Sequence, residues 1–281
     1  MTTPGYGVDW SAGLRLGAEE ELDGWLAAAL ALADDADGMA LAVPPDDLDV
    51  HAKPDGSFVT HVDQAIERHI RERIADAYPG HDVVGEEFEA TGSDAAVRWY
   101  VDPIDGTHNF MRGVPLYGTL IAAERDGELQ VGVVSAPGLG RRWWARRGGR
   151  AWVREHPGDT PRPVHVSGIG TLGDSQLLYR SILDMRGSRV AAAFEAMLPD
   201  VWRERAYGDF WGYALVATGA AEVMVERDLH VWDVAAPWVV VEEAGGRMTD
   251  FAGHRDWYAT EALASNGRVH GAILERFAQA R

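Results

Sequence analysis

The sequence predicts a mixed α/β (α+β) fold in two halves, and three observations support this prediction. Stretches with apolar residues at helical spacing alternate with short runs of strand-forming residues. The turn signals Asp126-Gly127 and Gly148-Gly149 separate pairs of such runs and indicate antiparallel hairpins. Residues 155–163, rich in Pro, Gly and Asp, mark an internal boundary. We therefore expect an N-terminal half over residues 1–160 and a C-terminal half over residues 161–281.

The first half begins with two predicted helices. Leucines recur at helical spacing from Glu19 to about Gly38, and a second amphipathic stretch opens at Thr60 and stops at Pro79-Gly80. Strands are predicted after them at 82–85, 98–102, 116–124, 129–135, 142–146 and 151–154. The second half is expected to add strands at 164–167, 176–179, 222–226 and 247–251, with helices at 188–198, 209–218, 234–244 and 269–279.

Composition excludes several classes of protein. The 281 residues carry a formal charge of −18, which disfavours nucleic acid and anionic membranes as partners because both would repel the chain. The absence of Cys rules out disulfides, thiol nucleophiles and Cys-type zinc sites. The start lacks the basic and apolar regions of a secretory signal, and no apolar run is long enough to span a bilayer. We therefore expect a cytoplasmic protein, with much of its negative charge in an acidic, solvated N-terminal region of fifty residues.

The segment Asp102-Pro-Ile-Asp-Gly-Thr107 follows a predicted strand and carries the clearest chemistry. Two carboxylates three residues apart at a strand end can face one point in space, and Mg²⁺ prefers such oxygen ligands. Asp102 could bridge two ions, Asp105 could complete one, and the Ile104 carbonyl could add a neutral ligand. Gly106 and Thr107 would present backbone N–H groups to a phosphate. An ordinary Asp-rich turn would explain the same letters.

Three further segments offer carboxylates to the same point. Glu86, in Gly-Glu-Glu, ends a predicted strand that could pair with the one before Asp102, although a solvated strand end is the alternative. Asp63 closes the run Lys53-x-Asp-Gly-Ser-x-Val-Thr-x-x-Asp, where Thr60 and Asp63 would also suit a helix cap. Asp233, in Trp-Asp-Val-Ala-Ala, stands where a helix begins and could be a simple N-cap.

Together and in this order, the four motifs resemble the inositol monophosphatase family of Mg²⁺-dependent, lithium-sensitive sugar phosphatases, from about residue 20 onward. The resemblance implies a layered α/β/α/β/α sandwich, with an antiparallel sheet in the first half and a smaller mixed sheet in the second. It also implies a homodimer and hydrolysis of a phosphate monoester by in-line attack of a metal-activated water.

The resemblance assigns roles to individual residues. The implied ligands of two to three Mg²⁺ ions are Asp63, Glu86, Asp102, the Ile104 carbonyl, Asp105 and Asp233. Within this set, Glu86, Asp102 and Ile104 form the first ion site, and Asp102, Asp105 and Asp233 form the second. Asp63 and Glu86 would hold a third ion. Glu86, Asp63 and Thr107 would carry the catalysis, with Thr107 and Asp63 orienting the water, and Gly106 and Thr107 would bind phosphate.

Substrate choice is expected to depend on residues beyond the phosphate. The implied contacts to the organic part of the substrate are Arg205, Gly208, Asp209, Glu226 and Asp233. Asp209 and Glu226 would suit either sugar hydroxyls or a cationic amine and imidazole. The blocks around 134–145 and 205–211 resemble the actinobacterial-type histidinol-phosphatases of this family, which implies L-histidinol phosphate as substrate and a place in histidine biosynthesis. His61 and His108 depart from the usual pattern near the site.

Other readings of the sequence remain open. An inositol-1-phosphate phosphatase, or a related sugar or nucleotide phosphatase, would use the same ligands. A non-catalytic protein that binds a metal or a phosphorylated metabolite could share the fold, although it would be expected to lack at least one ligand. Gly168-x-Gly-x-x-Gly173 has the letters of a dinucleotide loop but no helix opens after it, so a plain loop is favoured.

Overall fold

The computed structural model describes residues 18–54, 56–90, 92 and 95–279. Part of the acidic N-terminal region, including Asp9 and Arg15, lies outside the described residues, as does Asp55 of the first motif. Within the described segments the strands form a seven-stranded sheet, a five-stranded sheet and a short hairpin. No helix in these segments is long and apolar enough to cross a membrane.

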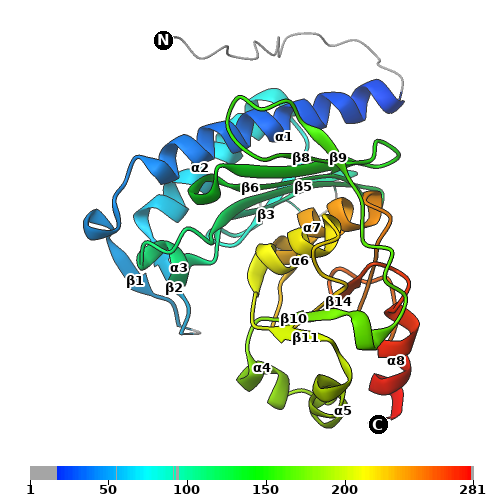
Figure 1. Cartoon of the computed structure of the whole chain (residues 1–281). Coiled ribbons are helices and arrows are strands. Elements are labelled where there is room, and N and C mark those ends of the chain that lie inside the picture. Colours follow the sequence, from blue (N-terminus) through cyan, green and yellow to red (C-terminus); the bar gives the residue numbers. More distant parts are fainter. Residues whose placement is uncertain (1–17, 55, 91, 93–94, 280–281) are drawn as a thin grey trace.

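Helices and sheets alternate in layers (Figure 1). Helices α1 (Ala18–Leu41) and α2 (His61–Ala77) cover the outer face of the larger sheet. Helices α6 (Asp209–Ala217) and α7 (Val231–Glu243) lie between the two sheets. The outer face of the smaller sheet is covered by α4 (Ile182–Arg186), α5 (Ala191–Met197) and α8 (His270–Gln279). This confirms the α/β/α/β/α arrangement expected from the resemblance.

The larger sheet follows chain order. Its strands are β3 (Asp82–Gly85), β4 (Val97–Asp105), β5 (Gly118–Arg125), β6 (Glu128–Ala136), β7 (Arg141–Arg146), β8 (Ala151–Arg154) and β9 (Arg162–Val164). Strands β3 and β4 pair in parallel, and each later neighbour pairs antiparallel. At the β5–β6 turn Asp126 and Gly127 have φ of 52° and 78°, the left-handed conformation that tight hairpins need. Both hairpin predictions are confirmed.

The smaller sheet is mixed, as expected. Its order is β11 (Arg203–Arg205), β10 (Gln176–Tyr179), β12 (Val223–Arg227), β14 (Glu261–Ser265) and β13 (Arg247–Thr249). Strand β10 pairs in parallel with β11 and β12, whereas β14 is antiparallel to β12 and β13. The remaining regular elements are β1 (Val50–Ala52), β2 (Phe58–Thr60), α3 (Thr107–Met111) and 3₁₀ turns at Pro45–Asp47, Pro137–Leu139, Leu172–Asp174 and Leu198–Asp200.

Several elements differ from the prediction. The strand expected at 164–167 is β9, which ends at Val164 and pairs with β8 at the edge of the larger sheet, where Pro163 is tolerated. The helix expected at 188–198 is α5, and α4 precedes it. Helix α7 begins three residues before the predicted start at residue 234, and Pro237 lies in its second turn. The loop at 168–173 contains no α-helix, as expected.

The acidic first helix is anchored to the larger sheet and is not simply solvated. Alanines and aromatic or aliphatic side chains such as Trp25 and Leu32 form its buried face. Asp37 accepts hydrogen bonds from Ser135 Oγ at 2.8 Å and from Arg142 Nη2 at 2.7 Å. A buried guanidinium therefore balances one of the acidic residues of this region.

Candidate active site

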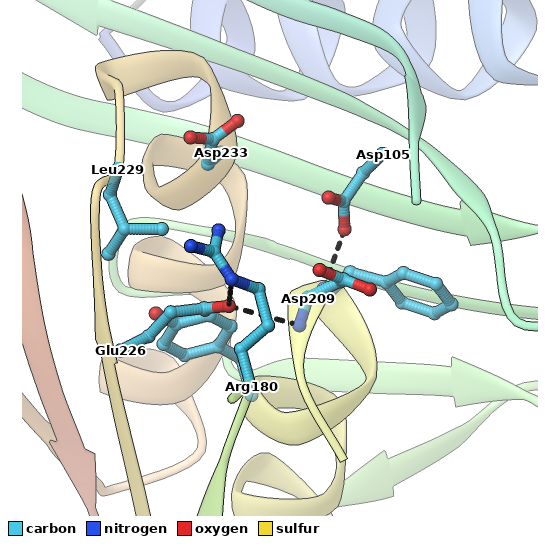
Figure 2. A pocket seen from close by; sticks show the side chains of 8 residues that line it. Asp105, Arg180, Asp209, Glu226, Leu229 and Asp233 are labelled. Atoms are coloured by element: carbon cyan, nitrogen blue, oxygen red, sulfur yellow. Dashed lines mark hydrogen bonds and ion pairs between the residues drawn. The ribbon is translucent and has the colours of Figure 1, made fainter. Parts of the chain in front are cut away.

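Four of the predicted site residues line one pocket between the layers (Figure 2). Asp105 comes from the end of β4, Asp209 from the start of α6, Glu226 from β12 and Asp233 from the first turn of α7. The other residues lining this pocket are Arg180, Phe210, Tyr213 and Leu229. The pocket thus joins residues that are up to 128 positions apart in the chain.

The end of β4 places Asp102 and Asp105 at the site. The register of β4 against β5 shifts between them, and Thr119 Oγ1 donates to the Pro103 carbonyl at 2.8 Å, which holds the irregular segment. Asp102 is 2% exposed, and its Oδ1 has no hydrogen-bond partner among the described residues. Asp105 Oδ2 accepts the Phe210 N–H at 2.6 Å, which links β4 to α6.

Gly106 makes the turn that follows. Its φ of 81° is left-handed, and a Cβ there would lie 2.9 Å from the Leu116 carbonyl oxygen, so glycine is required on both grounds. Thr107 begins α3, and its Oγ1 donates to the Ile104 carbonyl at 3.0 Å. The same Oγ1 lies 3.4 Å from Asp63 Oδ1. Two segments of the predicted site therefore meet at Thr107.

Asp63 is the helix cap that the sequence allowed, and one of its oxygens also faces the predicted site. It is the third residue of the capping box at the start of α2, where Oδ2 accepts the Thr60 N–H at 2.9 Å and the Thr60 hydroxyl. Its other oxygen faces Thr107. Asp233 is placed in the same way in α7, since its Oδ2 accepts the His230 N–H at 2.7 Å. Each helix cap therefore orients a carboxylate toward the site.

Glu86 is brought to Asp102 by strand pairing, as the sequence predicted. Gly85 pairs with Val101 in the parallel β3–β4 ladder, and the Glu86 N–H donates to the Val101 carbonyl at 3.2 Å. Lys53 Nζ donates to Glu86 Oε1 at 2.7 Å and to Glu87 Oε1 at 2.8 Å. Although burial opposes it, these contacts raise the pKa of Lys53, so that its ammonium stays charged.

The carboxylates of this site are crowded and raise one another's pKa values. Burial, with repulsion from Glu86, raises the pKa of Asp63 to about 6 and that of Asp233 to about 7. Burial, with repulsion from Glu86, Asp105 and Asp233, raises the pKa of Asp102 well above its usual value. The pKa of Asp105 is raised by burial and by repulsion from Asp209 and Asp233. Such a cluster is stabilised by cations or by protons.

The donor set fits Mg²⁺. It consists of carboxylates and a carbonyl, the hard oxygen ligands that this ion prefers, and the buried Asp102 Oδ1 lacks a donor among the described residues. In the described segments no three His, Asp or Glu side chains are close enough together to enclose an ion in this conformation. The reason is visible in their contacts, because Asp63, Asp233 and Glu86 each turn an oxygen to a neighbouring N–H or ammonium.

Arg180 is the charged residue of this pocket that sequence reasoning missed. It directly follows β10, at the carboxyl end of a strand that pairs in parallel with β12, and this position was the available signal. Its Nε donates to Asp184 Oδ2 at 2.9 Å and lies 3.9 Å from Glu226 Oε1. Gly208 stands against it, since a Cβ at Gly208 would lie 2.6 Å from three Arg180 atoms.

Asp209 and Glu226 meet in the pocket, whereas Arg205 does not join them. The Asp209 N–H donates to Glu226 Oε1 at 3.2 Å (Figure 2). Burial and repulsion from Asp209 raise the pKa of Glu226 to about 8. Arg205 ends β11 and donates to the Glu204 carbonyl at 2.6 Å, and it is not among the residues lining this pocket.

The chain is similar to known proteins over most of its length. A sequence model of the inositol monophosphatase family matches residues 21–281. The chain is 43% identical over 249 residues to a histidinol-phosphatase of Mycobacterium tuberculosis, covering 88% of this chain and 95% of that protein. It is 42% identical to a histidinol-phosphatase of Streptomyces coelicolor (81% and 86% covered) and 34% identical to an inositol-1-monophosphatase of Rhizobium meliloti (81% and 85% covered).

Solved structures share the fold. The extragenic suppressor protein suhB of Bartonella henselae superposes with a TM-score of 0.81 at 26% identity, covering 90% of this chain and 98% of that one. An IMPase of Thermotoga maritima gives a TM-score of 0.78 at 26% identity, with 93% and 98% covered.

Proposed function

The chain belongs to the inositol monophosphatase family, and from this premise we propose that it is a Mg²⁺-dependent phosphatase whose substrate is L-histidinol phosphate. The observation that carries the proposal is the buried carboxylate cluster, present in full in a chain 43% identical to a histidinol-phosphatase. A protein that had lost catalysis would be expected to lack part of this cluster.

The proposed roles are those that the family resemblance implies. Two to three Mg²⁺ ions would be held by Asp63, Glu86, Asp102, the Ile104 carbonyl, Asp105 and Asp233. When bound, the ions supply positive charge that attracts the phosphate and makes a water more acidic. Lys53 pairs with Oε1 of Glu86 and with Glu87, so Oε2 is the Glu86 oxygen that would be offered to an ion.

The chain's own groups would position the reactants. The Gly106–Thr107 turn would bind the phosphate through backbone N–H groups. The Thr107 hydroxyl, between the Ile104 carbonyl and Asp63 Oδ1, can orient the attacking water. Glu86 and Asp63 are the carboxylates placed to accept its proton. Hydrolysis then releases inorganic phosphate and the alcohol.

The charges of the pocket favour an amine in the organic part of the substrate. With Asp105 and Asp233 assigned to metal, Asp209 and Glu226 remain, and Arg180 balances one negative charge. A bound ammonium would favour the charged forms of these two carboxylates, which suits histidinol phosphate better than a neutral ring of hydroxyls. The raised pKa values of Asp209 and Glu226 reflect burial of uncompensated charge, which a bound ammonium would relieve.

The decisive experiment measures phosphate release from four esters with Mg²⁺ and with EDTA. The esters are histidinol phosphate, inositol 1-phosphate, fructose 1,6-bisphosphate and adenosine 3′,5′-bisphosphate. Mg²⁺-dependent release, fastest from histidinol phosphate, is expected. Preference for inositol 1-phosphate would instead support the alternative suggested by the Rhizobium meliloti relative. Release from none of the four would refute the phosphatase.

Asp209→Asn separates the two substrates. It keeps the size of the side chain but removes one negative charge, so KM for histidinol phosphate should rise by about tenfold, which corresponds to loss of one partly buried charge pair of about 1.4 kcal/mol. KM for inositol 1-phosphate should change little. An equal rise for both esters would argue against Asp209 as the amine contact.

We also propose that the protein acts as a homodimer, as its family resemblance implies. Sedimentation velocity at micromolar concentration is expected to show a species of twice the chain mass of 30.7 kDa. A species of the chain mass at these concentrations would contradict the dimer.

A further inference from the structure

The loop that carries Glu86 is hydrogen-bonded to another carboxylate, the buried side chain of Glu67. Glu67 lies on α2 and is fully buried. Its Oε2 accepts the Glu87 N–H at 2.7 Å, and its Oε1 accepts the Phe88 N–H at 3.2 Å. The two peptide N–H groups that follow Glu86 therefore both point at one side chain.

Arg71, one turn further along α2, completes this contact. Its Nε donates to Glu67 Oε1 at 2.7 Å, which balances the buried charge. Its other guanidinium nitrogens donate to the Val83 carbonyl at 3.2 Å and to the Phe88 carbonyl at 2.8 Å. One guanidinium thus joins the end of β3, the loop and Glu67.

Gly85 leaves room for Glu67. A Cβ at Gly85 would overlap the Glu67 carboxylate, lying 2.7 Å from Oε2 and closer still to Oε1. Gly85 does not have a positive φ, so the glycine is needed for space and not for backbone conformation. The glycine of the Gly-Glu-Glu motif is therefore explained by a side chain 18 positions earlier.

We propose that Glu67 and Arg71 are positioning residues that fix the direction of Glu86 toward the metal site. They touch neither the phosphate nor the water, and they act through the backbone of residues 85–88. Outer groups of this kind orient a ligand before the ion arrives, so the ordering cost is met on folding rather than on binding. This inference rests on the proposed Mg²⁺ site.

Mg²⁺ binding without substrate tests the proposal. Calorimetric titration with Mg²⁺ alone is expected to show 10- to 100-fold weaker binding for Glu67→Gln and for Gly85→Ala. The Glu67→Gln variant loses the ion pair with Arg71 and one of its two acceptor oxygens, whereas the Gly85→Ala variant displaces an unchanged Glu67. Arg71→Lys, which keeps the charge but loses the bonds to the loop carbonyls, should give an intermediate loss.

Amide hydrogen exchange in EDTA gives a readout that needs no metal. The amides of Glu87 and Phe88 should exchange at least tenfold faster in Glu67→Gln and Gly85→Ala, while the amides within α2 stay protected. If Glu67→Gln does not fold, Gly85→Ala and Arg71→Lys decide the question by the same two measurements.

Asp37→Asn is the matched control. Asp37 is also a largely buried carboxylate paired with an arginine, but it ties α1 to the larger sheet. This variant removes the ion pair with Arg142 and should leave Mg²⁺ affinity unchanged. Wild-type affinity and wild-type exchange in both Glu67→Gln and Gly85→Ala would overturn the positioning role. Absence of Mg²⁺ binding by the wild-type protein would instead refute the proposed metal site, and the exchange rates would still decide whether Glu67 holds the loop.

Discussion

Asp233→Asn is expected to make the metal-free protein more stable, and the gain should grow with pH. The pKa of Asp233 is raised to about 7 by burial and by nearby carboxylates, from 3.8. An asparagine has the shape of the protonated acid, and its Oδ1 can still accept the His230 N–H that Asp233 accepts at 2.7 Å. The substitution therefore removes a buried charge while it keeps the helix cap.

The size of the effect follows from linkage. Between pH 3.8 and about 7 the folded state binds more protons at Asp233 than the unfolded state does, so stability falls as pH rises through this window. At about 1.4 kcal/mol per pKa unit, the raised pKa of Asp233 lowers the stability of the wild-type protein by about 2 kcal/mol at pH 5 and by about 4 kcal/mol at pH 8. At roughly 2–4 °C per kcal/mol, the advantage of the variant should widen by roughly 4–8 °C between these pH values.

Thermal melts of both proteins in EDTA at pH 5, 6, 7 and 8 measure this. Comparing the two proteins cancels groups with the opposite trend, such as His270, whose pKa burial lowers to about 4. At a hundredfold excess over Kd, Mg²⁺ should stabilise the wild-type protein by about 2.7 kcal/mol and so raise its melting temperature. The melting temperature of the variant should rise less. A difference between the proteins that is independent of pH, or a variant less stable than wild type at pH 8, would refute the reasoning.

Asp250→Asn is a control that should lose stability at pH 8, where Asp233→Asn gains it. Although burial opposes it, hydrogen bonds from His254 and from backbone N–H groups lower the pKa of Asp250, so its charged form stabilises the fold. Asp105→Asn should reduce turnover by more than about 100-fold, the upper range for loss of an outer-shell metal partner, while circular dichroism stays that of the wild type; retained turnover would contradict the site. Gly106→Ala should cost about 1–2 kcal/mol of stability because of the left-handed conformation, and it should also raise KM because the new Cβ meets the Leu116 carbonyl. Gly127 is also left-handed but has open space around it, so Gly127→Ala should cost stability and leave KM unchanged. Lys53→Met leaves Glu86 and Glu87 without their ammonium, so the protein in EDTA at pH 8 should lose about 1–3 kcal/mol of stability and melt at a lower temperature. Added Mg²⁺ should stabilise this variant more than it stabilises the wild type. An unchanged melting temperature in EDTA would show that the lysine does not offset the repulsion between the two glutamates.

Most regular elements could be predicted from local patterns. The strand over residues 176–179 and the hairpin turns at Asp126-Gly127 and Gly148-Gly149 need only alternation and turn residues, which act over a few positions. Strand β14 could not be predicted in this way. Its five residues, Glu261–Ser265, become a strand because β12 and β13 pair with them from both sides.

The carboxylates of the site were recognisable because each lies in a motif with its own local reason. Asp63 occupies the third position of the Thr60 capping box, a pattern of neighbouring residues that can be recognised without the fold. Asp233 was expected as the N-cap of its helix, but His230 is the N-cap and Asp233 lies three residues after it. Arg180 and Glu67 have no such pattern. One faces Glu226 across 46 positions and the other holds Glu87 across 20, and each reads in the sequence as an ordinary charged residue.

By itself, the sequence determined the family and most of the regular elements, and it predicted which acids belong to one site, because these depend on residue type and short spacing. The tertiary structure alone decided how the negative charge is balanced. Among the 44 acidic residues, Asp37 is offset by Arg142, Glu67 by Arg71 and Glu86 by Lys53. Asp102, in contrast, is buried with an oxygen that has no donor among the described residues. Electrostatic energy depends on distance and burial, which a sequence does not contain, and for that reason only the folded chain distinguishes an acid that stabilises the fold from one that needs a cation.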